Sequence, residues 1–268
     1  MDDTKIRVGT SAFTAEGWVG SFYPLDMNPR DFLSYYATKF DIVEVDSTYY
    51  AIPAKSTVQG WYDKTPPGFQ FALKVPSLIT HEKMLVDCRE DMNSFIETVD
   101  LLGEKLGPLL LQFPYFNKAK FQSGKEFLSI LKPFLSCLPK DHKFALEIRN
   151  KWWLSKDFFN ILRDHNVAFA LIDQSWMPRP WEMKPHLNVI TSDFLYVRWL
   201  GDRKGIETVT KVWDKTIIDK TADLEKWVEV LKKLASGQMK MKTFAFANNH
   251  FAGHGPATVE QFKLLWNR

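Results

Sequence analysis

Short apolar runs of β type recur at fairly regular intervals along this chain. We expect strands in these runs, at 6–10, 41–46, 69–75, 108–112, 143–149, 167–173, 194–199 and 242–248. Runs that are apolar almost throughout are typical of a parallel sheet that is covered on its outside.

Helical periodicity occupies most of the gaps between these runs. In 91–102 and 223–234 the apolar residues recur three and four positions apart, as on one face of a helix, and Phe32, Tyr35 and Tyr36 form a shorter apolar face. The proline-broken gap 174–192 predicts a long loop with at most a helical turn. Eight β segments alternating with helices predict an α/β fold, a single (β/α)₈ TIM barrel over residues 1–268. A doubly wound open sheet is the structural alternative, but no G-x-G-x-x-G follows the first strand.

Composition narrows the class of protein only a little. The chain of 268 residues has a formal net charge of +3, which permits a nucleic-acid partner without arguing for one. Cys88 and Cys137 form no CxxC pair, and a reducing compartment is the simplest context for them. No secretory signal opens the sequence and no run of about 18 apolar residues occurs, so we expect a cytoplasmic protein without a membrane partner.

Charged residues gather at the carboxyl ends of the expected strands. In a barrel this end carries the active site, and residues two apart on a strand share a face, as Glu147 and Arg149 do. The two-residue period collects nine inward positions: Glu44, Asp46, Lys74, Gln112, Glu147, Arg149, Asp173, Arg198 and Asn248. An ion-pair network that only fills the barrel end would explain any one pair. Because desolvating each charge costs several kcal/mol, the whole set favours a functional site.

These residue types suggest several kinds of chemistry. The four carboxylates are suited to general acid or base catalysis, and they leave open a divalent metal as cofactor. Lys74 is a candidate base, Schiff-base nucleophile or electrostatic anchor. Together with Arg149 and Arg198, it predicts that an anionic group binds at this end of the barrel.

The loops after the last two strands suggest a phosphate site. Arg203 and Lys204 lie between Gly201 and Gly205, and 253–255 brings two glycines to the start of the last helix. Barrel enzymes often bind phosphate at this corner. His250 and His254 stand four apart as in some zinc sites, but a glycine-rich loop lacks the helix that makes this spacing useful, so we predict no metal ligands.

Aromatic residues also follow the strand ends, where rings are able to stack on a sugar or a base. They are Trp18, Tyr23, Tyr49, Tyr50, Trp152, Trp153, Trp176 and Trp199. Core packing is the alternative explanation for several of them.

With these motifs the chain resembles the bacterial and archaeal barrels known as domain of unknown function 72. The resemblance rests on blocks in one order, at 9–24, 35–53, 71–83, 106–114, 145–153, 196–201 and 247–258. It implies a TIM barrel, similar to the xylose-isomerase and endonuclease-IV group, and it implies no particular reaction. The family often has Gly-Trp where this chain has Ala12-Phe13, and often His-Gly where it has Leu200-Gly201.

Three functional hypotheses follow. The leading one is an enzyme, a hydrolase or an isomerase, that acts on a small polar or anionic substrate such as a sugar, a phosphoester or a nucleotide derivative. The expected catalytic residues are Glu147 as acid or base, Arg149, Lys74, Asp46 and Asp173. The expected substrate-binding residues are Glu44, Gln112, Arg198, Asn248, Asn249, His250, Tyr49, Trp18 and Trp153. The alternatives are a nucleic-acid-binding or processing protein and a non-catalytic ligand-binding barrel; the oligomeric state stays open.

Overall fold

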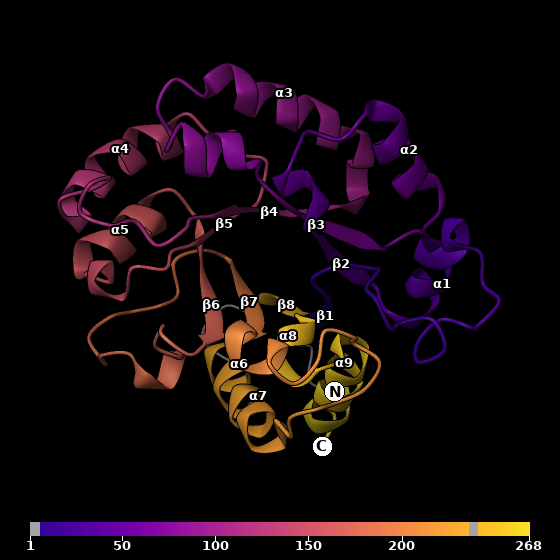
Figure 1. Ribbon diagram of the computed structural model, residues 1–268. Coiled ribbons are helices and arrows are strands. Elements are labelled where there is room, and N and C mark those ends of the chain that lie inside the picture. Colours follow the sequence, from indigo (N-terminus) through magenta and orange to yellow (C-terminus); the bar gives the residue numbers. More distant parts are fainter. Residues whose placement is uncertain (1–5, 236–240) are drawn as a thin grey trace.

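Eight parallel strands surround a common axis in the computed structural model, which describes residues 6–235 and 241–268 (Figure 1). The strands are β1 (Ile6–Thr10), β2 (Ile42–Val45), β3 (Gln70–Lys74), β4 (Leu106–Gln112), β5 (Phe144–Glu147), β6 (Ala168–Gln174), β7 (Phe194–Gly201) and β8 (Lys242–Ala247). Each predicted strand overlaps one of them, so the predicted (β/α)₈ barrel is confirmed.

Helices alternate with the strands and encircle the sheet (Figure 1). They are α1 (Phe32–Lys39), α2 (Lys55–Asp63), α3 (Arg89–Val99), α4 (Gly124–Ser136), α5 (Lys156–Asp164), α6 (Arg203–Glu207), α7 (Thr221–Ala235), α8 (Asn249–Ala252) and α9 (Gly255–Trp266). The periodic segments 91–102 and 223–234 correspond to α3 and α7. Within the two described ranges, no helix has the length and apolar character needed to cross a membrane.

Side-chain caps set where several of these helices begin. Ser123 precedes α4 and accepts a hydrogen bond from the Glu126 amide, and Ser155 precedes α5 and accepts one from the Phe158 amide. Such caps satisfy amides that have no partner inside the helix. The apolar face of α7, which includes Leu224 and Trp227, is buried against the barrel, as its spacing predicts.

A tyrosine hydroxyl joins the two ends of the sheet. The order of hydrogen-bonded strands, β1-β8-β7-β6-β5-β4-β3-β2, leaves β1 and β2 at the ends. The Thr10 amide donates to the Tyr36 hydroxyl at 2.9 Å, and that hydroxyl donates to the Ile42 carbonyl at 3.1 Å. A Cβ on Gly9 would overlap the same carbonyl, so glycine is needed where the strands approach. The barrel therefore closes through a side chain of α1 in place of a backbone ladder.

The long connection after β6 contains one 3₁₀ turn, Pro180–Glu182, as expected for the gap 174–192. Glu182 accepts a hydrogen bond from the Arg179 amide at 2.8 Å, which fixes the start of this turn. The connection lies at the carboxyl end of β6 and thus contributes to the wall around the mouth of the barrel.

Candidate functional site

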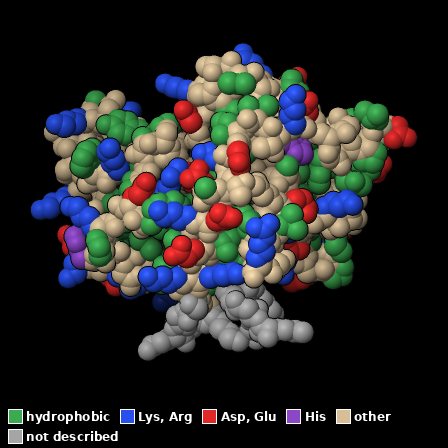
Figure 2. Space-filling model, turned by 90° about the horizontal axis from the view of Figure 1, so that it is seen from below, with side chains coloured by type: hydrophobic (Ala, Val, Ile, Leu, Met, Phe, Trp, Pro, Cys, Tyr) green, Lys and Arg blue, Asp and Glu red, His purple; other side chains and the backbone are tan. Residues whose placement is uncertain are grey.

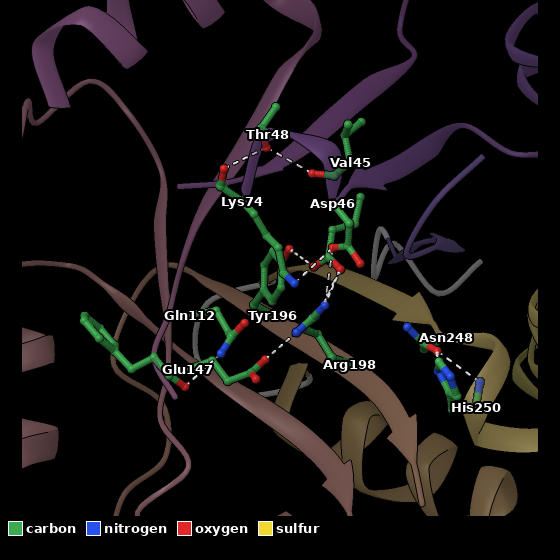
Figure 3. A network of polar contacts seen from close by, with 12 residues as sticks. Val45, Asp46, Thr48, Lys74, Gln112, Glu147, Tyr196, Arg198, Asn248 and His250 are labelled. Carbon is green, nitrogen blue, oxygen red and sulfur yellow. Dashed lines mark hydrogen bonds and ion pairs between the residues drawn. The ribbon is translucent and has the colours of Figure 1, made fainter. Parts of the chain in front are cut away.

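Six charged side chains, from four strands and the residues that follow them, meet at the carboxyl end of the barrel, with Arg198 of β7 at their centre. Figure 3 labels Asp46, Lys74, Glu147 and Arg198 among them. The guanidinium of Arg198 donates to Glu44 at 2.7 and 3.1 Å and to Glu147 at 2.8 Å. Arg198 is almost fully buried, and neither glutamate has any exposed side-chain surface. Burial opposes the charge of Arg198, but Glu44 and Glu147 raise its pKa well above the usual value. Arg198 therefore keeps its positive charge, and it links Glu44 of β2 with Glu147 of β5.

Glu44 is fully buried in this cluster. Besides Arg198, it accepts a hydrogen bond from the Tyr196 hydroxyl at 2.5 Å. Burial raises the pKa of Glu44, and the Arg198 guanidinium opposes this shift. Burial and the neighbouring Glu44 also raise the pKa of Tyr196, which keeps its hydroxyl protonated and available as a donor.

Glu147 is held between two guanidinium groups, because Arg149 forms an ion pair with its other oxygen. Burial alone would raise the pKa of Glu147, but Arg149 and Arg198 lower it below the usual value. Arg149 also donates to the side-chain oxygen of Gln174 at the end of β6. The carboxylate of Glu147 is thus ionised, fully buried and committed to two cations.

Asp46 and Lys74 are the members of the cluster that pair with each other at its open side. Their ion pair measures 3.2 Å, and 35% of the Asp46 side chain is exposed. The ammonium of Lys74 also lies 5.3 Å from the centre of the Tyr49 ring, within the range of a cation–π contact. The pair is more exposed than the ion pairs that Glu147 forms with Arg149 and Arg198.

These residues border a cavity of about 300 Å³ at the mouth of the barrel. Its lining is formed by Asp46, Tyr49, Tyr50, Lys74, Gln112, Arg149, Gln174, Arg198, Leu200, Arg203, Asn248 and His250. The lining contains four cationic side chains and a single carboxylate, that of Asp46. Glu44 and Glu147 lie behind this wall. The surface that a ligand would contact is therefore biased toward positive charge.

Glu207 links two residues of the cavity rim. Its Oε1 accepts from Nε of Arg203 at 2.7 Å and lies 3.0 Å from Nε2 of His250. The other ring nitrogen of His250 lies 2.5 Å from the side-chain oxygen of Asn248 (Figure 3). Burial lowers the pKa of His250, and the contact with Glu207 opposes that shift. Glu207 therefore orients both a cation and an imidazole toward the cavity.

The segment after β3 has an irregular backbone beside the cluster. A π-turn, Leu78–Glu82, follows the strand, and Met84, Leu85 and Asp87 have positive φ angles. Both features are uncommon and occur often at functional sites. The turn places the His81 ring against Tyr49, where burial and then Lys74 lower the pKa of His81 to about 4.

Asp173 does not join the cluster, and the expectation that it points inward is wrong. Its carboxylate accepts from the indole of Trp227 on α7 at 2.7 Å and from Arg179 at 3.1 Å. Gln174, the next residue, lines the cavity. Because neighbouring residues on a strand face opposite sides, Asp173 must lie on the outer face of β6, under α7.

Four predicted substrate-binding residues do not line the cavity: Glu44, which lies behind its wall, and Trp18, Asn249 and Trp153. The buried Trp18 donates its indole N–H to the Asn249 side chain at 3.2 Å, and the same oxygen of Asn249 accepts from the Gly255 amide. Trp153 packs against Phe116 and Phe127 on the α4 side. These contacts show that Trp18, Asn249 and Trp153 pack the barrel wall and its loops.

The glycines after β8 also have structural tasks. The amides of Gly253 and Gly255 donate to the backbone and the side chain of Asn249, respectively. They are therefore occupied and not available to a phosphate group. Of the predicted phosphate corner, only Arg203 lines the cavity.

Sequence reasoning missed three residues of the site: Tyr196, Gln174 and Glu207. Tyr196 stands two positions before Arg198, so the period that selected Arg198 also applied to it. Gln174 is found only when the correct face of β6 is assigned to the inside of the barrel. Glu207 is distant in sequence from His250, and no local pattern connects them.

Within residues 6–235 and 241–268, no three His, Cys, Asp or Glu side chains are grouped so as to hold a metal ion. Of the histidines four apart, His250 contacts Glu207, whereas His254 caps α9. The two are not arranged around a common point.

Comparison with known proteins places the chain in a family. The family model described as "Protein of unknown function DUF72" matches residues 7–268. A crystal structure of a DUF72 family protein from Thermotoga maritima is 28% identical, with a TM-score of 0.76, and the alignment covers 98% of this chain and 100% of that one. UPF0759 protein YecE of Escherichia coli is 32% identical over 124 residues, which are 46% of this chain and 43% of that protein.

That match spans less than half the length of the curated relative. The fold is shared more widely, since a D-psicose 3-epimerase structure has a TM-score of 0.52 at 10% identity, over 90% of this chain and 84% of that one. Such a low identity shows the barrel architecture alone. The match to the family model over nearly the whole chain shows that this protein belongs to the DUF72 family.

Proposed function

We propose that this barrel is an enzyme that acts on a small anionic molecule bound at its carboxyl end. The observation that carries the proposal is the charge of the cavity wall, where four cations face the ligand space beside one carboxylate. Cations held in a cavity at this end of a barrel attract and orient an anionic group, and they stabilise charge that develops in a reaction.

The cations have different tasks. Arg198 is engaged by Glu44 and Glu147, so it supplies a fixed positive field. Lys74, Arg149 and Arg203 are the candidates for direct contact with the anion, because each lines the cavity and is less buried than Arg198. An oxyanion such as phosphate or carboxylate matches donors of this geometry.

Asp46 replaces Glu147 as the proposed acid or base. Glu147 has no exposed atom and is shared by two guanidinium groups, whereas Asp46 borders the cavity and contacts Lys74. A carboxylate beside an ammonium is suited to moving a proton on a bound molecule, as hydrolases and isomerases both require. The fold likeness to a sugar epimerase does not choose between these reactions.

A nucleic-acid partner ranks second. Phosphodiester backbones are attracted by extended basic surfaces. On the face seen in Figure 2, basic and acidic side chains are interspersed, and the formal net charge of the chain is only +3. A non-catalytic ligand-binding barrel would use the same cavity without proton transfer at Asp46.

The first experiment is a calorimetric titration with inorganic phosphate. Arg203→Gln should weaken binding, whereas Arg7→Gln should not, because Arg7 pairs with Asp41 at the amino end of β1. The second arm offers a panel of sugar phosphates and other phosphomonoesters and follows turnover. Binding that is equal in the wild-type protein and the Arg203 variant would contradict the proposed site, and turnover that survives Asp46→Asn would contradict the role of Asp46.

A further inference from the structure

Every strongly exposed aromatic side chain of the described residues lies at the mouth of the barrel. Tyr50, Tyr115, Trp152 and Trp176 are 81%, 66%, 84% and 45% exposed. They follow β2, β4, β5 and β6, respectively. Single exposed apolar residues are common on any surface, but a set confined to one end is typical of a binding surface.

Two of these rings share a second cavity. Trp152 and Trp176 line a space of about 450 Å³ between the β5–α5 connection and the long connection after β6. Its other walls include Met177, Met183 and Leu187. Neither indole packs against another aromatic ring within the described part of the chain. The Lys151 ammonium lies 5.0 Å from the Trp152 ring centre, and Glu182 and Lys184 also line the space. Flat apolar faces beside a cation form a surface suited to a ring that carries or adjoins negative charge.

Residues that are close in sequence line the second cavity and the cationic one. Arg149 and Gln174 line the first cavity and contact each other, and Lys151 and Ser175, within two residues of them, line the second. The same two strand ends therefore supply both cavities. A ligand with two unlike parts, one anionic and one flat, would match this pairing.

We propose that the cavity of Trp152 and Trp176 binds a planar ring of the substrate, whose anionic group occupies the cationic cavity. The substrate class is thus a small organic anion with an aromatic ring. This inference rests on the proposed function, because it needs the anion to be held at the barrel mouth. Stacking on the indole faces would give the ring its affinity and would set its distance from Asp46.

Two phosphate esters of equal charge test the proposal: methyl phosphate, without a ring, and phenyl phosphate. Calorimetric titration should show about threefold to tenfold tighter binding of phenyl phosphate, the range expected for one aromatic contact. In the double variant Trp152→Ala/Trp176→Ala this ratio should fall to near one, while methyl phosphate binds as in the wild-type protein. Tyr115→Ala is the matched control, because Tyr115 is an exposed rim aromatic that lines neither cavity, and it should keep the ratio.

Indole N–H signals in a nitrogen–proton spectrum give an independent readout. Phenyl phosphate should shift the signals of Trp152 and Trp176, assigned with Trp152→Phe and Trp176→Phe, and leave those of the buried Trp18 and Trp227 in place. A ratio near one in the wild-type protein, or one that persists in the double variant, would overturn the ring site while leaving the anion site intact. Failure of methyl phosphate to bind would overturn the proposed function, and the ring site with it.

Discussion

Arg198 shows how a single residue holds the site together. It is the common partner of two fully buried carboxylates, and removing it would leave both charges without their main counter-ion. We predict that Arg198→Met lowers the free energy of unfolding by about 3–5 kcal/mol, the usual cost of breaking a buried ion pair. Urea denaturation measures this change. Arg203→Met, at an exposed ion pair, should change stability by less than about 1 kcal/mol; equal losses in both variants would contradict the central role of Arg198.

Asp46 and Asp173 both lie at strand ends, and their Asn variants allow effects on turnover and on the free energy of unfolding to be measured separately. Asp46→Asn should abolish turnover and retain phosphate binding, because the substitution removes a proton acceptor and no cation. Asp173→Asn should keep turnover and lower the free energy of unfolding by about 1–3 kcal/mol, because Asp173 is buried against Trp227 and Arg179. Activity assays and urea denaturation of both variants measure these effects. Lost turnover in Asp173→Asn together with full turnover in Asp46→Asn would contradict the two roles.

At the scale of residues, the two-residue period of strands predicted which side chains meet at the site. That rule correctly brought Glu44, Lys74, Glu147 and Arg198 together, because their strands are regular at these positions. It failed for Asp173 because the wrong face of β6 was assigned to the inside: Ile172 pairs with the inward Arg198, so Asp173, which pairs with Trp199, faces outward. Trp18 and Trp153 were misplaced because the sequence does not show which side of a loop an indole faces.

At the scale of elements, the junction of β1 and β2 depends on one hydroxyl group of α1. Tyr36→Phe removes it and leaves the Thr10 amide and the Ile42 carbonyl without this partner. We predict a loss of about 1–3 kcal/mol in the free energy of unfolding, the cost of unsatisfied buried polar groups. Tyr35→Phe, one residue earlier on α1, is the control and should have little effect. Equal unfolding midpoints for the two variants would show that the hydroxyl does not join the strands.

A second link between elements lies at the amino end of the barrel and depends on pH. The ring nitrogens of His142 lie 2.7 Å from Asp100, after α3, and 2.9 Å from Asp141. Burial alone would lower the pKa of His142, but hydrogen bonds with Asp100 and Asp141 raise it above 6.5. A raised folded-state pKa gives stability that is full below the unfolded-state pKa and is lost as pH rises through the folded-state value.

We therefore predict that the wild-type protein loses stability relative to His142→Gln between about pH 6 and pH 8, the region at and above the usual histidine pKa. Urea midpoints of both proteins, measured across this range, isolate the contribution of His142 from those of other histidines. A stability difference that stays constant with pH would show that His142 is not held as an imidazolium.

The sequence predicted the number and order of the strands and their alternation with helices, because continuous apolar strands and helical spacing are local patterns. It did not predict the closure of the sheet by Tyr36 or the link through His142. Both depend on side chains that meet only after distant segments pack together, and a residue type alone does not show its partner.

At the scale of the whole molecule, the barrel assembles cations from separate strands around one cavity and places aromatic rings beside it. Buried carboxylates behind the wall hold Arg198 and Arg149, so the cations are fixed before a ligand arrives. Such preorganisation reduces the cost of ordering side chains on binding. We therefore propose that this cavity is an anion site.

The most direct test is a crystal structure of the protein grown with tungstate, an oxyanion that scatters X-rays anomalously. We expect an anomalous peak within hydrogen-bonding distance of Lys74, Arg149 or Arg203, and its loss in the Arg203→Gln/Lys74→Gln variant. Tungstate bound elsewhere on the protein, with this cavity lacking a peak, would show that the cavity is not an anion site.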